Sequence, residues 1–308
     1  MTMLQSREKV AIVAVASVSI ILNIYTFVLA YPQISILNSG CCASHVLAKD
    51  FSAYYTAAWR LVHDSMNVYT PGSVSDGGPQ ILPYPQSFKY LPSFLIFILP
   101  LTSIGYQNAL VFFDCVQIAL LPVIACLLFR LNVKKSLLTI SLLMVVAILQ
   151  PSPTPNWGFS ISYFWQWEEG QDKVLLLTLL LCAYYFGLKR RPLLSGIMFA
   201  LGSFDPRFLL LGFPLFLFFN KDSLKKGIAS GVLSLIALNS FFLVPGVGAG
   251  FLSMMGRSGL ETPLFYYAYI PFLTIIALMI VNWKELYQFY SSLLTGKTGQ
   301  LTTAGTSQ

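Results

Sequence analysis

Charged residues are scarce in this sequence. Only 10% of its 308 residues are Asp, Glu, Lys or Arg, whereas 56% are hydrophobic and the mean hydropathy is +0.70. A chain with so few charged residues has too little polar surface to cover a soluble globule. The composition therefore excludes a soluble domain and predicts a protein of the lipid bilayer. The formal net charge of +7 would suit nucleic acid in a soluble protein. In a membrane protein the positions of the charges matter more than their sum.

Motifs for metal or nucleotide binding are also missing. The two histidines, His45 and His63, and the five cysteines form no Cys-x-x-Cys pattern or zinc ligand set. The adjacent Cys41 and Cys42 leave a disulfide open if their loop is extracytoplasmic. The segment SSLLTGKT has Ser291 where a phosphate-binding loop needs its first glycine. No motif therefore supports NTP hydrolysis or zinc chemistry. The two histidines are interpreted as surface groups or as ligands of the acceptor substrate.

Long apolar runs are what the sequence has instead. The first, residues 10–31, is too long for the core of a signal peptide and predicts a retained transmembrane helix. Further runs lie at residues 91–104, 109–129, 136–149, 174–188, 193–204, 208–219, 227–245 and 264–281. We expect an all-α fold, a polytopic transmembrane helical bundle that forms a single integral membrane domain over residues 1–295, with a disordered tail at 296–308.

A large polar stretch, residues 32–90, follows the first run and is expected to be an extracytoplasmic loop. Within it, residues 50–66 are predicted to form a short amphipathic helix because aromatic residues recur at spacings of three and four. These aromatics are Phe51, Tyr54, Tyr55 and Trp59. We expect their rings to lie at headgroup depth on the membrane surface.

Basic residues gather in short clusters between the apolar runs. The clusters lie at residues 7–9, 130–135, 189–191, 221–226 and 284–297. Lys and Arg concentrate in short cytoplasmic loops, so both termini are predicted to be cytoplasmic in the plasma membrane. Segment 193–219 must then turn back at Asp205, Pro206 and Arg207 as a re-entrant hairpin of two half-helices, and its rival is one long helix. Residues 91–104 are expected to dip in from outside without crossing.

On this topology, ionisable residues from three regions meet at the extracytoplasmic face. The regions are Asp50 with Lys89 and Tyr90, the segment WQWEEGQDK at residues 165–173, and residues 205–207. A charge beside apolar helices is costly and seldom without a role. For any single residue, an interfacial cap or salt bridge is the alternative interpretation.

Several longer segments resemble a known class of enzymes. LAKDFSAYYTAAWRLVHDSMNVYTPG and YPQSFKYLPSFLIFILPL look like the opening signature of GT-C glycosyltransferases, which use polyprenyl-phosphate sugars. EEGQDKVLLLTLLLCAYYFGL and LLSGIMFALGSFDPRFLLLGFPLFLFF are similar to later elements of that class. The branch that the chain resembles contains the bacterial polyprenol-phosphate-mannose alpha-mannosyltransferases. Two departures are Asp205, which stands where the family commonly has Lys before Pro206, and a shorter C-terminal region.

The resemblance implies transfer of a hexose, mannose in that branch, from a polyprenyl-phosphate-sugar donor. The acceptor would be a hydroxyl of a glycan, glycolipid or protein on the extracytoplasmic face, with no role for nucleic acid. Asp50 begins the motif helix of the family and is implied as the catalytic base. Because a lipid phosphate leaves without a second acid to protonate it, one base on one face predicts inversion at the sugar carbon.

Substrate-binding residues are expected around Asp50. Candidates for the phosphate are the cations Lys89, Lys173 and Arg207, with headgroup contact as the alternative for the two lysines. Candidates for the sugar or the acceptor are Tyr54, Tyr55, Tyr90, Trp165, Glu168, Glu169 and Gln171. No cofactor is expected. Glu168, Glu169 and Asp172 are the set that would hold a divalent cation, and acceptor recognition or a solvated acidic loop are the other interpretations.

Two other functions compete with glycosyl transfer. A lipid or solute transporter or flippase would use the hairpin at residues 193–219 as a discontinuous gating helix, although no inverted repeat is visible. A non-catalytic membrane subunit is the other, because the C-terminal region is short for the family. Flux without a glycosyl product would indicate the first, and co-purification with a membrane protein the second.

Overall fold

In the computed structural model, the described residues are 10, 13–18, 20–25, 28, 49–63, 68–69, 88–131, 151–154, 158–161, 170–243, 246–258 and 269–295. Most of the polar loop at residues 32–90, the apolar run at 136–149 and the tail at 296–308 lie outside them. Expectations for those segments stay predictions.

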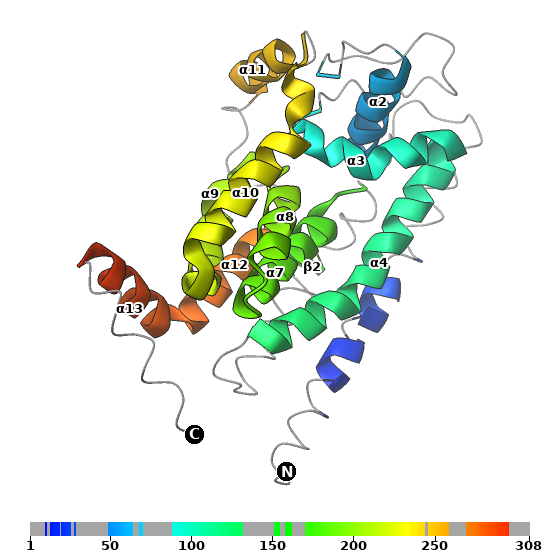
Figure 1. The fold of residues 1–308 in the computed structure, drawn as a ribbon. Coiled ribbons are helices and arrows are strands. Elements are labelled where there is room, and N and C mark those ends of the chain that lie inside the picture. The colour runs from blue at the N-terminus through cyan, green and yellow to red at the C-terminus, as the bar shows by residue number, and fades with distance from the viewer. Residues whose placement is uncertain are drawn as a thin grey trace.

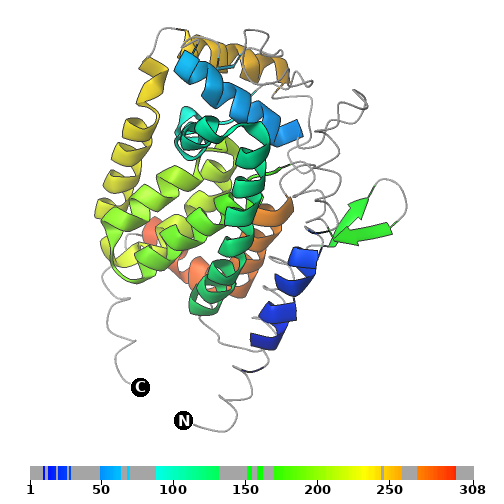
Figure 2. The same ribbon diagram turned by 90° about the vertical axis from the view of Figure 1, so that its right-hand side faces the viewer.

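The described residues form a helical bundle. Its long elements are α4 (Tyr106–Leu131), α7 (Lys173–Leu188), α8 (Pro192–Gly202), α9 (Pro206–Phe219), α10 (Leu224–Leu238) and α12 (Tyr269–Val281). Helices α7, α8 and α10 pack side by side and α4 lies against α7, while α2 (Lys49–His63) and α11 (Val247–Ser258) lie across the top of the bundle in both Figure 1 and Figure 2. Further short elements are η5 (Lys221–Ser223), η6 (Ser240–Leu243) and α13 (Trp283–Leu294). An antiparallel pair, β1 (Pro151–Thr154) and β2 (Gly158–Ile161), is an addition to the expected all-α class.

Helix α4 is the one described helix that is both long enough and apolar enough to cross a bilayer. It has 26 residues and a mean hydropathy of 2.4 in its most apolar window. Other apolar helices of the described part are shorter: α7, α8, α9 and α12, for example, have 16, 11, 14 and 13 residues, fewer than the roughly 20 that a full span needs. The polytopic arrangement of the whole chain stays a prediction.

Residues 92–104 form a chain of short helical turns rather than one helix. They comprise η2 (Pro92–Phe94), α3 (Leu95–Ile98) and η3 (Leu99–Ile104). Pro92 and Pro100 stand at the first turns of the two 3₁₀ helices, where a missing backbone N–H costs nothing. Gly105 ends the segment with a φ of 75°, a conformation that glycine adopts without strain.

The segment at residues 193–219 is two helices, α8 and α9, and not the single long helix that was its rival. Asp205 caps α9, because its carboxylate accepts a hydrogen bond from the backbone N–H of Arg207 at 3.1 Å. Pro206 follows at the first helical position, where its fixed φ suits a helix start. The helices run antiparallel: Ser195 Oγ accepts from Asn220 Nδ2 at 2.8 Å, so the start of α8 lies beside the end of α9.

Close packing of small residues joins α8 to α10. A Cβ added to Gly196 would lie 2.4 Å from Ser230 Oγ and 2.5 Å from the backbone nitrogen of Gly231. Ser230 Oγ donates to the carbonyl oxygen of Leu193 at 3.0 Å. The two backbones approach so closely that position 196 has no room for any side chain.

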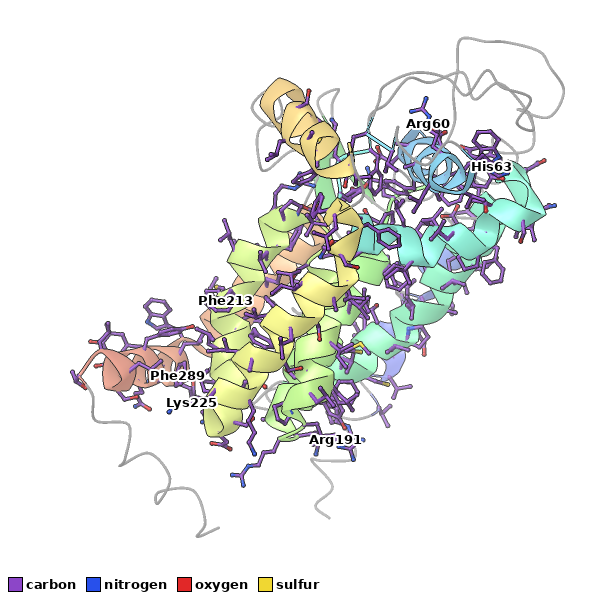
Figure 3. The ribbon with its side chains drawn as sticks, turned by 45° about the horizontal axis from the view of Figure 1, so that its top comes forward. Arg60, His63, Arg191, Phe213, Lys225 and Phe289 are labelled. Carbon is purple, nitrogen blue, oxygen red and sulfur yellow. The ribbon has the colours of Figure 1, made fainter. Side chains whose placement is uncertain are left out.

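The basic clusters at residues 189–191 and 221–226 lie at one end of the bundle. The turn between α7 and α8 and the turn between α9 and α10 meet there, and Arg190 pairs with Asp222 at 2.9 Å. Both side chains of this pair remain open to solvent. Figure 3 shows Arg191 and Lys225 at this end, and Arg60 and His63 of α2 at the opposite one.

The rings of α2 were expected at headgroup depth, and for three of them this expectation is wrong. Phe51, Tyr54 and Tyr55 are 0%, 2% and 2% exposed. Phe51 packs on Phe113 of α4 with ring centroids 5.2 Å apart. An amphipathic helix can bury its apolar face in lipid or in protein, and here the protein supplies the aromatic partners.

Candidate functional site

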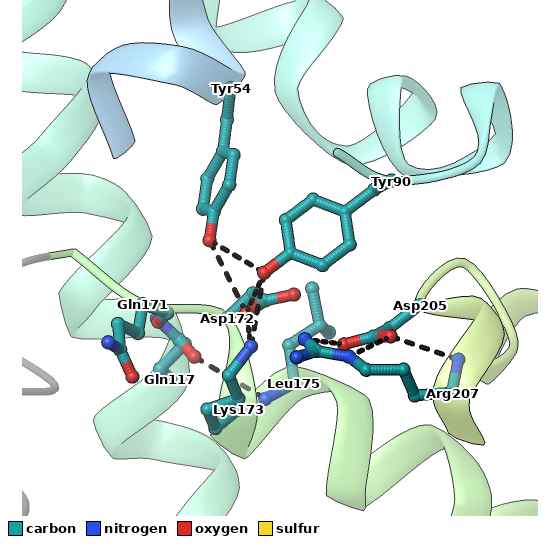
Figure 4. Close-up of polar contacts among 9 residues, drawn as sticks. All are labelled: Tyr54, Tyr90, Gln117, Gln171, Asp172, Lys173, Leu175, Asp205 and Arg207. Atoms are coloured by element: carbon teal, nitrogen blue, oxygen red, sulfur yellow. Dashed lines mark hydrogen bonds and ion pairs between the residues drawn. The ribbon is translucent and has the colours of Figure 1, made fainter. Parts of the chain in front are cut away.

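Residues from distant parts of the chain meet at the end of the bundle covered by α2. Tyr54 comes from α2, Tyr90 precedes η2, and Asp172 and Lys173 begin α7. Asp205 caps α9, and Arg207 lies in the first turn of that helix (Figure 4). The backbone N–H of Leu91 donates to the carbonyl oxygen of Phe204 at 2.7 Å. This bond joins the segment that carries Tyr90 to the turn that leads into α9 and Arg207.

One oxygen of Asp172 accepts most of the hydrogen bonds of this cluster. Its Oδ1 lies 2.8 Å from Lys173 Nζ, 3.3 Å from Tyr90 Oη and 3.4 Å from Tyr54 Oη. Lys173 Nζ also donates to Tyr90 Oη at 3.1 Å, and the two tyrosine hydroxyls are 3.2 Å apart. The spacing of local motifs did not reveal this role, because the partners are 118 and 82 residues away in sequence.

The ion pair of Asp172 and Lys173 is removed from water. Their side chains are 0% and 3% exposed. When two charges are excluded from water, their mutual attraction and additional hydrogen bonds are needed to offset the cost of desolvation. The two tyrosine hydroxyls supply such bonds on the side of Oδ1.

Burial also holds both tyrosines in their neutral form. It raises the pKa of Tyr54 and of Tyr90 above the ordinary phenol value, and the negative charge of Asp172 raises both further. Each hydroxyl therefore keeps its proton at neutral pH and stays a hydrogen-bond donor.

Arg207, expected to bind phosphate, already has a carboxylate partner. Its Nε donates to Asp205 Oδ1 at 2.8 Å and a terminal nitrogen reaches Asp205 Oδ2 at 2.5 Å. Asp205 is buried, whereas the side chain of Arg207 is 32% exposed. Asp205, which stands where the family commonly has Lys, thus holds the guanidinium of Arg207 in place and neutralises its charge.

Asp50, the expected base, lies at the N-terminal end of α2 and is partly buried. Burial raises the pKa of its carboxyl above the usual range, and nearby Asp172 raises it further. Lys173, a hydrogen bond from the Gln171 side chain and Lys89 act in the opposite direction on this pKa. Asp50 is therefore coupled electrostatically to the cluster of Figure 4.

Gln117 of α4 supports the segment that carries this cluster, and sequence reasoning missed it. Its Nε2 donates to the carbonyl oxygen of Gln171 at 2.6 Å, and its Oε1 accepts from the backbone N–H of Leu175 at 3.4 Å. Gln117 is fully buried. An amide in the middle of an apolar run was the available signal, because such a group needs buried polar partners.

The other expected site residues fall in different places. Tyr55 donates to the carbonyl oxygen of Thr102 at 3.3 Å, away from Asp172. Lys89 is exposed beside the buried Tyr90. Trp165, Glu168 and Glu169 lie outside the described residues. Within the described part of the chain, no group of three or more His, Cys, Asp or Glu side chains could hold a metal ion.

Comparison with known proteins gives one match. The model of glycosyltransferase family 87 matches residues 88–263, a range that includes Tyr90, Asp172, Lys173 and Arg207. Asp50 and the rest of α2 precede it. No curated protein and no solved structure matches the chain at a significant level.

Proposed function

The chain belongs to glycosyltransferase family 87, and we propose that it transfers a hexose from a polyprenyl-phosphate-sugar donor to an acceptor hydroxyl. Family membership makes it a membrane glycosyltransferase, which acts on a sugar donor and an acceptor. The lipid-phosphate donor, and mannose as its sugar, are supported by the resemblance of its segments to that branch of GT-C enzymes. The observation that carries the proposal is the buried polar cluster around Asp172, within electrostatic range of Asp50.

Asp50 is the general base of this proposal. It takes the proton of the acceptor hydroxyl as the oxygen attacks the anomeric carbon and the lipid phosphate leaves with the bonding electrons. A raised pKa suits this task, because a carboxylate with a higher pKa is a stronger base near neutral pH. Attack from one face with departure from the other inverts the configuration at that carbon.

The departing phosphate needs positive charge beside it. Lys89 is the cation best suited to this task, because it is exposed and acts on Asp50. Arg207 shares its charge with Asp205, and Lys173 shares its charge with Asp172, so each provides a hydrogen-bond donor rather than a full free charge. This division of roles favours Lys89 for the phosphate.

The distribution of charge supports an extracytoplasmic site. The exposed basic clusters at residues 189–191 and 221–226 share one end of the bundle, which would face the cytoplasm. Asp50 and the cluster around Asp172 would then face outward, where a polyprenyl-linked sugar is presented.

The test is transfer of labelled mannose from a polyprenyl-phosphate-mannose donor by the purified protein in liposomes. Replacing Asp50 by Asn should lower kcat by about 10²- to 10⁴-fold, the usual contribution of a positioned base. Asp222→Asn, the matched exposed carboxylate at the other end, should retain the wild-type rate. Full activity of Asp50→Asn would remove that residue from the mechanism.

A further inference from the structure

Asp172 has one oxygen that the cluster does not use. Its Oδ2 is buried and accepts no hydrogen bond from any described residue, while Oδ1 has Lys173, Tyr54 and Tyr90 around it. A buried carboxylate oxygen without a donor is among the costlier groups in a folded protein. Its persistence favours a donor from beyond the described residues, and a bound ligand is one such source.

The nearby donors are engaged elsewhere. Lys173 Nζ donates to Asp172 Oδ1 and to Tyr90 Oη, and Arg207 donates to both oxygens of Asp205. Figure 4 shows the carboxylate of Asp172 between the tyrosine hydroxyls and the pair of Asp205 and Arg207. Because Oδ2 is an acceptor and these donors contact other oxygens, a ligand that completes this site would bring a hydroxyl or N–H group.

We propose that Asp172 Oδ2 accepts a hydrogen bond from a hydroxyl of the donor hexose, so that the cluster around Asp172 is the sugar-binding subsite. This inference rests on the proposed glycosyl transfer and adds to it the residue that recognises the sugar. Tyr54 and Tyr90 direct their hydroxyls at the carboxylate, and their rings pack edge to face with centroids 5.3 Å apart, so an aromatic face beside the subsite could contact the apolar face of a pyranose.

The charges around the subsite define the class of hexose that it takes. Asp172 is balanced by Lys173 and Asp205 by Arg207, and Lys89 acts on Asp50, so the selection depends on the contact at Asp172 Oδ2 itself. The group that contacts this oxygen must donate a hydrogen bond, and the carboxylate of a uronic acid placed there would meet a like charge at close range, which disfavours binding strongly. The subsite therefore selects a neutral, hydroxyl-bearing hexose.

The experiment compares donors on the reconstituted full-length protein. The donors are polyprenyl-phosphate-mannose, its four monodeoxy analogues at carbons 2, 3, 4 and 6, and the glucuronic acid counterpart. For the wild type, one deoxy analogue should lose about 10- to 100-fold in kcat/KM, the usual effect of deleting a hydrogen bond to a charged group. The glucuronic acid donor should lose about 100-fold or more.

Asp172→Asn separates recognition from folding. It should lower kcat/KM for the parent donor and abolish the difference between that donor and the sensitive deoxy analogue. Asp222→Asn, the exposed control, should keep the wild-type pattern. The double variant Asp172→Asn with Lys173→Gln removes both charges of the buried pair, and it carries the same test if the single variant does not fold.

Three results would overturn the inference alone. Equal loss with all four deoxy donors in the wild type would show that no hydroxyl is singled out. Unchanged discrimination in both Asp172 variants would assign the effect to another residue. A wild type that transfers sugar but accepts glucuronic acid as well as mannose would remove the charge argument. Inactivity with every donor, in contrast, would overturn the proposed function together with the inference.

Discussion

At the end of the bundle that carries the candidate site, the ion pair of Lys173 and Asp172 has side chains that are 3% and 0% exposed. At the opposite end, the pair of Arg190 and Asp222 has side chains that are 75% and 38% exposed. The N···O distances are nearly equal, 2.8 and 2.9 Å. Distance alone therefore does not rank the two pairs, and the water around them decides what each is worth.

The largest expected difference between the two ends is in the pH dependence of the reaction. Asp50 must be deprotonated to act as a base, and burial raises its pKa. The rate should therefore fall about tenfold per pH unit below a pKa that lies above the ordinary carboxyl value. A profile of kcat/KM against pH measures this. Asp222→Asn should leave the profile unchanged, and a wild-type profile that is flat down to the ordinary carboxyl pKa would contradict the role of Asp50.

The raised pKa of Asp50 affects stability in the opposite direction to the rate: the rate rises with pH, whereas the contribution of this group to stability falls. The folded chain binds the proton of Asp50 more tightly than the unfolded chain, so the contribution of this group to stability declines as pH rises between the two pKa values. Asp50→Asn removes the charge of this partly buried group and should keep or raise the unfolding temperature at neutral pH. A lowered unfolding temperature would show that the charge stabilises the fold.

Breaking the buried pair should be the most damaging change to the fold. Lys173→Met leaves Asp172 as an uncompensated buried charge, which costs about 3–5 kcal/mol in other proteins. The free energy of unfolding in mixed detergent micelles measures the effect. If Lys173→Met unfolds like the wild type, then water reaches Asp172 and the contrast between the two ends disappears.

At the basic end, packing should matter more than charge. Gly196→Ala forces a methyl group against Ser230 and Gly231, and overpacking of this kind costs about 1–3 kcal/mol. The same unfolding experiment measures it. Gly105→Ala is not a suitable control, because its positive φ adds strain of its own. Gly231→Ala is a better one, since a Cβ there has no neighbour nearer than 3.6 Å. Equal losses in the two variants would argue against tight contact between α8 and α10.

The exposed pair should show the smallest effect. Asp222→Asn removes the partner of Arg190, and exposed pairs contribute about 0–1 kcal/mol because water already solvates both charges. The difference in unfolding free energy between this variant and the wild type should shrink further at high salt. A cost comparable to that of Lys173→Met would show that exposure is a poor guide to the value of these pairs.

Local sequence patterns were sufficient for some elements and not for others. The break between α8 and α9 was predictable, because Asp205 and Pro206 are a capping residue followed by a residue suited to the first helical position. The direction in which α2 faces was not. A helix with an aromatic stripe fits lipid headgroups or a protein surface equally well by its spacing, and only the position of α4 decides between them.

Some residues of the candidate site were likewise predictable from local sequence, and others were not. Asp50, Tyr54, Tyr90, Lys173 and Arg207 were named from short motifs and a family resemblance, and their roles stay predictions. The centrality of Asp172 was missed, since it depends on contacts across 82 and 118 residues that no local pattern encodes. The pairing of Asp205 with Arg207 spans two residues and was visible in the sequence. It was not predicted, because Asp205 was interpreted as part of the hairpin turn and as a departure from the family pattern, and Arg207 as a phosphate ligand.

The hydrogen bond from Leu91 to Phe204 has a mechanical consequence. It joins the segment of Tyr90 to the turn that leads into Asp205 and α9, so we expect the motions of these two segments to be coupled. Tyr54 belongs to α2, which is attached to the cluster by side chains rather than by a backbone bond among the described residues. A sugar that reaches the covered Asp172 should therefore enter by lifting α2, and the rate of that motion would set an upper limit on turnover.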